Sequence, residues 1–429
     1  MERDLSFERA VHFATELIRI PSLPGDEGAV ARRIVDELRA LGFDEARVDR
    51  AGNVIGRIRG TGDAPPVMLS SHMDVVDVGD RGSWEHDPHE GVVADGCLHG
   101  RGSMDLKGPL AIQLYAAARF VDERPAGDLL VVFSVYEEKG GWGMMQLMDS
   151  GALRPGAVIL AEATGGDLCT GHRGHAELAV EIHGRAAHAS APERGRNPNQ
   201  VLPHVMLALD ELSRAQPWDP VLGNATLTPT VIETWPRSGN VIPDRVRITL
   251  DLRVLPGWNE ERALDDIRAR LAERVPVVEG VRVEVLPGRA VFRAWTGYVE
   301  ESSNFTPGFL MDDEHPVVLA AARALREATG CTPAIRPWKF GTDGGHSCGT
   351  HGVPTIGYAP GVEALAHTTR ERLDLRSARE AFDAYPALIR AVQTALAGSR
   401  GIPVHGLVPA PYHDETRVVL PSLEPAAVT

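Results

Sequence analysis

Short apolar runs that alternate with helical patterns restrict the fold of this chain more than any other feature. Three such runs lie at 67–69, 129–135 and 158–160, and a helical pattern at 110–120 separates the first two. Strands that are apolar on both faces are typical of a parallel sheet that helices cover on both sides. The sequence therefore predicts an α/β fold, in which an αβα catalytic domain is built on a mostly parallel central sheet.

Similar patterns lie at both ends of the chain. Two amphipathic helices are expected within 5–41, separated by a loop that contains prolines. After about residue 299 the alternation resumes, with helices expected at 316–329 and 376–397 and an apolar run at 354–358. We therefore expect the C-terminal part of the chain to complete the domain that the N-terminal part begins.

A different pattern begins near Gly174. Residues 176–183 alternate between apolar and polar, as in a sheet with one face towards solvent. The expected elements then follow in the order strand, helix, strand, strand, helix, strand, which is the split ferredoxin-like pattern. We thus expect an inserted ferredoxin-like α+β domain. The predicted segments are the first part of the catalytic domain at 1–175, the insert at 176–298, the second part of the catalytic domain at 299–398 and a C-terminal tail of unassigned role at 399–429.

The composition argues against several classes of protein. A formal net charge of −15 disfavours binding to nucleic acid or to an anionic membrane, either of which needs a basic surface. No stretch is long enough to span a bilayer, and the N-terminus lacks the pattern of a signal peptide. The cysteines show no paired spacing, so neither a disulfide framework nor a thiolate zinc site is expected. We therefore expect a cytoplasmic protein with a small-molecule partner.

A set of acidic and histidine side chains, most of which directly follow an apolar run, forms the candidate site. The members are His72, Asp74, Asp105, Glu137, Glu138, Glu162 and His367. Because ligands of such sheets collect at the carboxyl ends of the strands, we expect these side chains to converge there. Imidazole and carboxylate groups suit a divalent cation. The pattern predicts a two-metal hydrolytic site.

Two members of the set also have interpretations that involve no metal. In extended structure His72 and Asp74 point to one face, where Asp74 would fix the tautomer of the imidazole, but one histidine among 16 is weak evidence alone. Asp105 follows a glycine-rich turn and could simply cap a helix. As a metal ligand, its two oxygens would instead bridge two ions.

The pair Glu137–Glu138 is the most informative part of the set. Two adjacent glutamates at the end of an apolar strand repel each other, and in a cleft they would be costly without a cation. Since adjacent strand residues point to opposite faces, we expect one glutamate to bind metal and the other to transfer a proton. A solvated strand end is the alternative.

Five segments carry these residues and resemble the motifs of a known family. They read SSHMDVV, GRGSMDLKG, VYEEKGG, LAEATGG and APGVEALAHTTRE. In this order they resemble the di-metal exopeptidases and deacylases that include carboxypeptidase G, acetylornithine deacetylase, aminoacylase and succinyl-diaminopimelate desuccinylase. The resemblance extends over about residues 8–397.

The resemblance implies a role for each member of the set. His72, Asp105 and Glu162 would hold one ion, and Asp105, Glu138 and His367 would hold the other, with Asp105 as the bridge. Glu137 would be the general base and acid, and Asp74 would orient His72. The two divalent ions would be zinc in the first instance, with manganese or cobalt as alternatives. One departure is Glu162-Ala163-Thr164, where family members often have Glu-Pro-Thr.

The resemblance also gives roles to residues of the insert, which in the family is a lid that often forms a homodimer. His188 would reach the partner's active site and stabilise the oxyanion, although by composition it could equally be a loop histidine. Asn240 and Arg253 would bind the carbonyl and carboxylate of the substrate. Arg253 could instead form a simple surface ion pair with Asp251.

The expected activity is hydrolysis of an amide-type C–N bond in an N-acyl amino acid, a dipeptide or a related small amide. The same scaffold could alternatively hydrolyse a non-peptide C–N bond, such as that of an amine on an aromatic acid. A remote alternative is a serine hydrolase, because Gly345-His346-Ser347-Cys348-Gly349 matches a nucleophile elbow, but the residues before Ser347 form a glycine-rich loop rather than a buried strand. A relative that has lost catalysis would lack Glu137 or a ligand, and none is missing.

Overall fold

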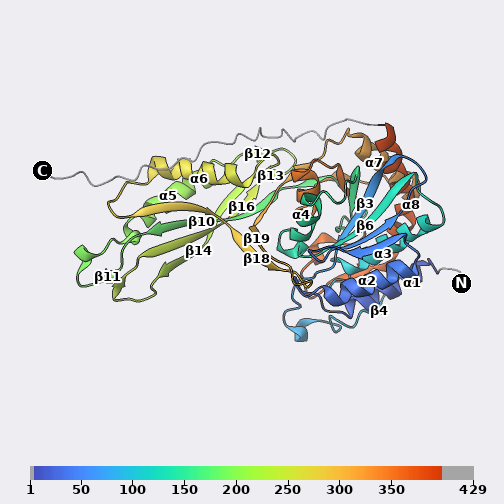
Figure 1. The fold of residues 1–429 in the computed structure, drawn as a ribbon, viewed down its shortest axis with the longest axis horizontal. Coiled ribbons are helices and arrows are strands. Elements are labelled where there is room, and N and C mark those ends of the chain that lie inside the picture. Colours follow the sequence, from blue (N-terminus) through green and yellow to red (C-terminus); the bar gives the residue numbers. More distant parts are fainter. Residues whose placement is uncertain (1–3, 399–429) are drawn as a thin grey trace.

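The computed structural model describes residues 4–398. The predicted tail at 399–429 lies outside the described residues. Figure 1 shows an elongated molecule with a larger lobe, which contains both the first and the last helices, and a smaller lobe that we call the insert. No helix in the described range combines the length and apolar character that a membrane crossing requires.

An eight-stranded sheet forms the centre of the larger lobe. Its strands in spatial order are β1 (Glu45–Val48), β2 (Val54–Ile58), β6 (Gly127–Ser134), β3 (Ala64–His72), β7 (Ala157–Leu160), β23 (Thr355–Gly357), β8 (Leu168–Cys169) and β22 (Ile335–Arg336). The β3 strand runs parallel to β6 and β7, and β7 runs parallel to β23. These central strands are almost wholly buried, which explains their continuous apolar runs.

Helices pack around this sheet and build one apolar core with it. They are α1 (Phe7–Ile18), α2 (Gly28–Ala40), α3 (Lys107–Ala118), α4 (Trp142–Asp149), α7 (Pro316–Thr329) and α8 (Leu375–Gly398). Local signals fix their ends: Ser6 caps α1 by accepting from the backbone N–H of Arg9, and α7 ends at Gly330, whose φ of 75° favours glycine. Every residue of α3 is buried, and this helix packs against α1, α8 and β3. The predicted α/β class with a mostly parallel central sheet is confirmed.

The insert contains a separate antiparallel sheet with its own apolar core. Its elements in chain order are β10 (Gly174–His183), α5 (Leu202–Arg214), β14 (Thr226–Trp235), β16 (Arg245–Val254), α6 (Glu260–Arg274) and β17 (Arg282–Pro287). The spatial order is β14-β16-β10-β17, as the split ferredoxin-like pattern requires. In β16 every second residue is buried, so one face of the sheet packs on the core. The ferredoxin-like insert is therefore confirmed as an element of the fold.

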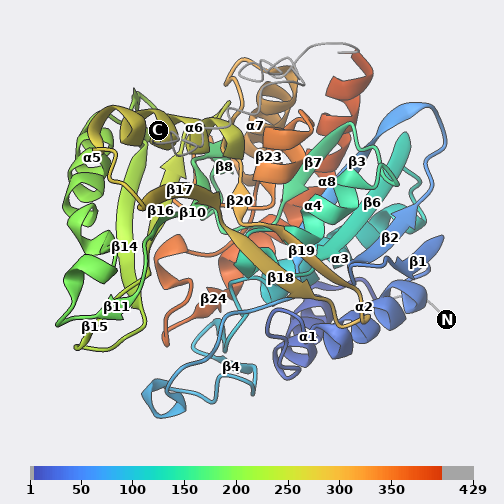
Figure 2. The same ribbon diagram turned by 60° about the vertical axis from the view of Figure 1, so that its left-hand side comes forward.

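A hairpin of β18 (Arg289–Arg293) and β19 (Val299–Ser303) leaves the insert and packs on the larger lobe. Figure 2 shows it crossing that lobe towards α2. Phe292 is 4% exposed and stacks on Trp142, with ring centroids 5.1 Å apart, and the indole N–H of Trp295 donates to the carbonyl of Gly52. The predicted boundary at 298/299 falls within this hairpin, and the domain boundaries stay a prediction.

Short strands complete the structure. They are β4 (Val92–Ala94), β5 (Cys97–His99) and β24 (Arg372–Asp374) in one sheet, and the pairs β9 (Gly171–His172) with β21 (Phe309–Leu310), β11 (Ala187–His188) with β15 (Val241–Ile242), and β12 (Trp218–Asp219) with β13 (Gly223–Asn224). A further short strand, β20 (Phe305–Thr306), pairs with β10 of the insert.

Candidate metal centre

His72, the last residue of β3, lies at the centre of the candidate site. Its side chain is 1% exposed, and its Nδ1 lies 2.9 Å from the backbone carbonyl oxygen of Asp74. A proton on Nδ1 satisfies that carbonyl and leaves the lone pair of Nε2 free. The Nε2 atom lies 3.1 Å from Asp105 Oδ1 and 3.5 Å from Glu162 Oε1. His72 thus presents one nitrogen to a group of carboxylates.

Asp105 lies between two imidazoles. Its Oδ1 faces His72, as given above, and its Oδ2 lies 3.3 Å from Nε2 of His367. The same His367 nitrogen lies 3.0 Å from Glu138 Oε2. Each oxygen of Asp105 therefore faces a different histidine, which is the placement that a bridging carboxylate requires.

Glu137 and Glu138 do not belong to a strand, so the expectation based on opposite strand faces is wrong. The β6 strand ends at Ser134, Tyr136 adopts a φ of 56°, and Glu137–Lys139 form a 3-10 turn. The carboxylate of Asp74 accepts hydrogen bonds from the backbone N–H groups of Glu137 and Glu138, each at 3.1 Å. This tertiary contact holds the turn and separates the two side chains.

The carboxylate of Asp74 therefore acts on the turn, whereas its own backbone carbonyl contacts His72. The Nδ1 atom of His72 is 3.7 Å from Asp74 Oδ1 but 2.9 Å from the Asp74 carbonyl oxygen. The main-chain carbonyl of Asp74 thus orients the His72 ring in the structure. The assignment of that role to the carboxylate stays a prediction.

The site brings together six of the expected residues in two overlapping groups. Ligand atoms of His72, Glu137 and Glu162 lie within 4.8 Å of one another, as do those of His72, Asp105 and Glu138. His367 joins the second group through Asp105 and Glu138. Imidazole nitrogens and carboxylate oxygens are the donors that zinc, manganese and cobalt accept in proteins. The donor set therefore fits divalent cations.

The charges of the site lead to the same conclusion. Burial and the charge of Glu162 raise the pKa of Glu137 well above its ordinary value. Burial alone would lower the pKa of His72, but the hydrogen bond to Asp105 and the charge of Glu162 raise it well above its ordinary value. Hydrogen bonds to Asp105 and Glu138 raise the pKa of His367 to about 10. Several buried carboxylates this close together repel one another and are costly to bury unless positive charge lies beside them. Bound cations would supply that charge.

Glu371 binds the backbone next to the candidate ligand Asp105. It was not identified from the sequence, although it is the last residue of the segment APGVEALAHTTRE. Its Oε1 accepts hydrogen bonds from the backbone N–H groups of Met104 and Asp105, each at 3.0 Å, and its Oε2 lies 2.5 Å from Arg101 Nη1. Burial raises the pKa of Glu371 to about 7, although the charge of Arg101 opposes the shift. Glu371 therefore fixes the loop that carries Asp105.

Asp343 is a second buried carboxylate that was not identified from the sequence. Its Oδ2 accepts a hydrogen bond from Ser134 Oγ at 2.7 Å, while Oδ1 is buried without a hydrogen-bond partner. Burial raises the pKa of Asp343 to about 7. Its charge in turn contributes to the raised pKa values of Glu137 and Glu162. The surrounding letters GTDGG gave no signal beyond a loop.

The expected residues of the insert lie apart from this centre within one chain. Figure 1 places β11, which carries His188, at the end of the insert furthest from the larger lobe. His188 is exposed, and its Nδ1 accepts a hydrogen bond from the backbone N–H of Ser190 at 3.1 Å. Asn240 is also exposed and accepts from Ser238 Oγ at 2.7 Å. Their roles at the active site stay predictions.

Arg253 forms the ion pair that the sequence left open. Its Nε lies 3.1 Å from Asp251 Oδ1, and Asp251 Oδ2 lies 3.0 Å from Nε2 of His175. The Arg253 side chain is still 43% exposed, so part of its guanidinium remains accessible. A role in substrate binding stays a prediction.

Ser347 lacks the surroundings of a nucleophile. It is fully buried in a short π-helical turn, Gly345–Thr350, and its hydroxyl lies 2.9 Å from that of Thr355. No histidine within residues 4–398 forms a hydrogen bond with it. A serine hydrolase needs such a base, so the structure does not support that alternative.

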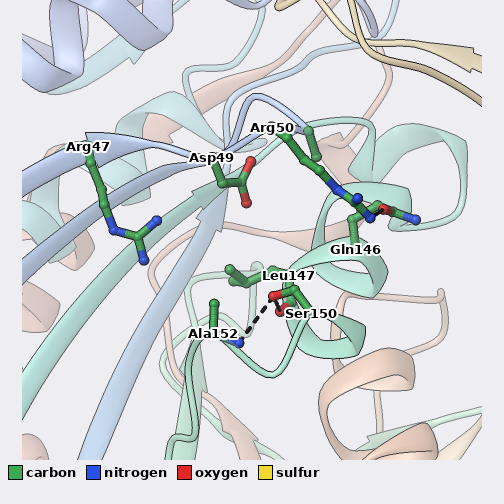
Figure 3. A pocket seen from close by; sticks show the side chains of 8 residues that line it. Arg47, Asp49, Arg50, Gln146, Leu147, Ser150 and Ala152 are labelled. Atoms are coloured by element: carbon green, nitrogen blue, oxygen red, sulfur yellow. Dashed lines mark hydrogen bonds between the residues drawn. The ribbon is translucent and has the colours of Figure 1, made fainter.

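A hollow of about 310 Å³ lies at the C-terminal end of α4. It contains none of the expected site residues. Figure 3 shows Arg47 on one side and Arg50 beside Gln146 on the other, with Asp49 between them. Arg50 Nη2 donates to Gln146 Oε1 at 3.0 Å. This hollow is therefore separate from the metal centre.

Comparisons with known proteins agree with this geometry. The family model described as Peptidase family M20/M25/M40 matches residues 68–391. The uncharacterized protein YgeY of Escherichia coli K12 is 33% identical over 364 residues, which cover 84% of this chain and 88% of YgeY. A succinyl-diaminopimelate desuccinylase of Paracoccus denitrificans is 31% identical over 338 residues, which cover 74% of this chain and 82% of the relative.

Solved structures share the fold. The metallo-carboxypeptidase Sso-CP2 of Sulfolobus solfataricus has a TM-score of 0.68 at 16% identity, over 90% of this chain and 99% of that one. The YXEP protein of Bacillus subtilis, described as a dinuclear metal binding peptidase, has a TM-score of 0.65 at 16% identity, over 90% of this chain and 98% of that one. At these identities the likeness concerns the fold.

Proposed function

The chain belongs to the peptidase family M20/M25/M40 and is a dinuclear metal hydrolase, and we propose that it cleaves an amide-type C–N bond of a small N-acyl amino acid or peptide. The observation that carries the proposal is the convergence of His72, Asp105 and Glu162 with Glu138 and His367 around a shared carboxylate. A desuccinylase among the relatives, which by its name removes an acyl group from an amine, supports amide cleavage.

Each ligand assignment is supported by a contact within the site. His72, Asp105 and Glu162 would hold one cation, and Asp105, Glu138 and His367 the other. Zinc is the first candidate for both positions, with manganese or cobalt as alternatives, because all three accept nitrogen and oxygen donors. When bound, two such ions acidify a shared water and polarise the carbonyl of the substrate.

Glu137 is the group that remains for proton transfer. Its Oε2 lies 3.9 Å from His72 Nε2, so it faces the centre of the site without a close contact. We assign to it the removal of a proton from the attacking water and the return of that proton to the leaving nitrogen. Its buried surroundings, which raise its pKa, suit a carboxyl that alternates between the two protonation states.

We further propose a cytoplasmic homodimer. In the dimer the His188 of one protomer would complete the site of the other and stabilise the oxyanion, while Asn240 and Arg253 would bind the carbonyl and carboxylate of the substrate. The support is that β11 lies far from the metal centre within one chain (Figure 1). The cysteines of the described range are unpaired, as in a reducing compartment.

Replacing Glu137 by Gln tests the assignment of the base. We expect kcat to fall by a factor on the order of a thousand for any N-acyl amino acid or dipeptide that the protein hydrolyses, because proton transfer is lost. Metal content, measured by elemental analysis, should stay at two ions per chain. The control is Glu327→Gln, which changes an exposed carboxylate of α7.

Two results would contradict the proposal. Turnover close to that of the unmodified protein would exclude Glu137 as the base. Loss of metal in the variant would instead identify Glu137 as a metal ligand. This alternative is a definite one, because Glu137 lies in one group of possible ligands with His72 and Glu162.

A further inference from the structure

A second hollow, of about 460 Å³, lies directly beside the metal centre, and we call it the side pocket. Its lining includes Glu138, Lys139, His175, Val291, Phe292 and Asn304. Glu138 belongs to the candidate metal centre, so a substrate bound at that centre would lie next to the side pocket. Neither the expected roles of the insert residues nor the comparisons give a function to the other lining residues.

Contacts within the insert and between the two lobes hold residues of the side pocket in place. Thr306 Oγ1 donates to the carbonyl of Gly140 at 2.9 Å, which ties β20 to the turn that carries Glu138. His175 is held by Asp251, with His175 Nε2 and Asp251 Oδ2 3.0 Å apart. Phe292 is held by its stacking on Trp142. The pocket is therefore built before a ligand arrives, which lowers the entropic cost of binding.

The lining of the side pocket includes a free cation. Lys139 is exposed and forms no ion pair with any residue of the range 4–398. Within that range the side-chain amide of Asn304 likewise has no hydrogen-bond partner. The only other lysines of the chain are Lys107, which is buried, and Lys339. A free ammonium and a free amide that line the same pocket are suitable donors for a carboxylate.

The lining also includes apolar residues. Val291 is 54% exposed although it is hydrophobic, and its neighbours Ala290 and Phe292 in β18 also line the pocket. Exposed apolar side chains in a concave surface gain free energy when a ligand covers them. The side pocket thus combines apolar lining residues with two donors, and a ligand that matches both has a short apolar stem with an anionic end.

We propose that the side pocket binds a carboxylate at the end of a short apolar stem of the substrate, with Lys139 as its charged partner and Asn304 as a second donor. This inference rests on the proposed function, since it names the substrate class of that site. The carboxylate is distinct from the one assigned to Arg253. The preferred substrates are therefore amides with an additional acidic group, either in the acyl part or in the side chain of the amino acid.

Two matched substrate pairs test this inference. N-glutaryl- and N-pentanoyl-amino acids differ only by a terminal carboxylate on the acyl part, and N-acetylglutamate and N-acetylnorvaline differ in the same way on the side chain. We expect the acidic member of at least one pair to have the higher kcat/KM. In Lys139→Gln the ratio of acidic to neutral kcat/KM should fall about tenfold or more, since a charge-assisted contact is lost. Lys139→Arg, which keeps the charge, should retain most of the ratio.

A binding experiment separates this inference from the proposed function. Glutarate should bind the metal-loaded protein more tightly than butyrate in calorimetry, and Lys139→Gln should remove the difference. Arg326→Gln, which removes an exposed charge from α7, is the matched control and should leave it unchanged. A preference that survives Lys139→Gln, or no preference at all, overturns the inference. If no amide is hydrolysed but glutarate binds through Lys139, the proposed function fails and the side pocket stands.

Discussion

His172 is a buried histidine whose surroundings permit only its neutral form. Its Nδ1 lies 2.9 Å from the backbone carbonyl oxygen of Arg173, and its Nε2 accepts a hydrogen bond from the backbone N–H of Thr342 at 3.1 Å. A second proton on the ring would turn Nε2 into a donor that faces another donor. Burial lowers the pKa of His172 to about 4, and this group therefore makes stability depend on pH.

The pKa of residue 172 is about 4 in the folded protein and about 6.5 in the unfolded chain, and this difference decides how the free energy of unfolding changes with pH. Between about pH 6.5 and pH 4 the unfolded chain binds a proton at residue 172 that the folded protein does not bind, so the free energy of unfolding falls as the pH is lowered. We expect a loss of about 2 kcal/mol between pH 6.5 and pH 4.5 from this group. Urea unfolding of the metal-free protein at both pH values measures the change.

His172→Gln isolates this contribution, because glutamine supplies a donor and an acceptor but does not titrate. The variant should lose about 2 kcal/mol less than the unmodified protein over the same pH range. The control is His204→Gln, which replaces an exposed histidine of α5 and should leave the pH dependence unchanged. An equal pH dependence in both variants would show that folding does not lower the pKa of His172.

Sequence motifs identified the residues that touch the centre but not those that support them. His72 and Glu162 directly follow apolar runs, so their position can be inferred from the strand that precedes them. Glu371 acts on the backbone of Asp105, which is 266 positions away in the chain, and Asp343 acts on Ser134, which is 209 positions away. Contacts over such distances depend on the complete fold and have no local pattern.

The turn after β6 is a structural element that the sequence likewise did not predict, because long-range contacts determine it. The sequence predicted a continued strand through Glu137, whereas Tyr136 leaves the strand with a positive φ. The hydroxyl of Tyr136 donates to the carbonyl of Arg293 at 2.9 Å, and its backbone N–H lies 3.3 Å from Glu27 Oε1. These tertiary contacts decide the direction of the turn. In contrast, the helices and strands of the insert have clear periodicity, and their order was predicted correctly.

The β18–β19 hairpin should contribute directly to the stability of the larger lobe. Phe292 packs between Tyr136 and Trp142, with centroid distances of 5.3 Å and 5.1 Å. Phe292→Ala would leave a cavity at this junction, and truncation of a buried phenylalanine costs about 3 kcal/mol or more. We expect a loss of that size in the free energy of unfolding, measured by urea denaturation.

The neighbouring strand residue provides the matched control. Val291 points to the other face of β18 and is 54% exposed, so Val291→Ala should change the free energy of unfolding by about 0.5 kcal/mol or less. Similar losses in the two variants would mean that the hairpin is not anchored through Phe292. Retention of stability in Phe292→Ala would mean that the junction between the lobes is plastic.

At the scale of the whole molecule, the position of the insert supports assembly of two chains. Its edge strand β14 exposes Val231 at 48% and Ile232 at 49%, and an exposed edge with apolar side chains is a ready surface for a second copy. His188 lies at the far end of the same insert (Figure 1). A two-fold arrangement of the chain would allow each insert to reach the other metal centre, and a C2 dimer is the commonest such arrangement.

Subunit mixing tests whether His188 acts between chains. His188→Ala and Glu137→Gln should each be nearly inactive alone, because one lacks the proposed oxyanion donor and the other the proposed base. After exchange of subunits in a mixed dimer, one of the two sites would combine the Glu137 of one chain with the His188 of the other. With random pairing we expect recovery to about one quarter of the activity of the unmodified protein, since about half of the dimers are mixed and each has one intact site. If His188 acts within its own chain, every site in the mixture lacks one of the two groups, and no activity returns however long the subunits exchange.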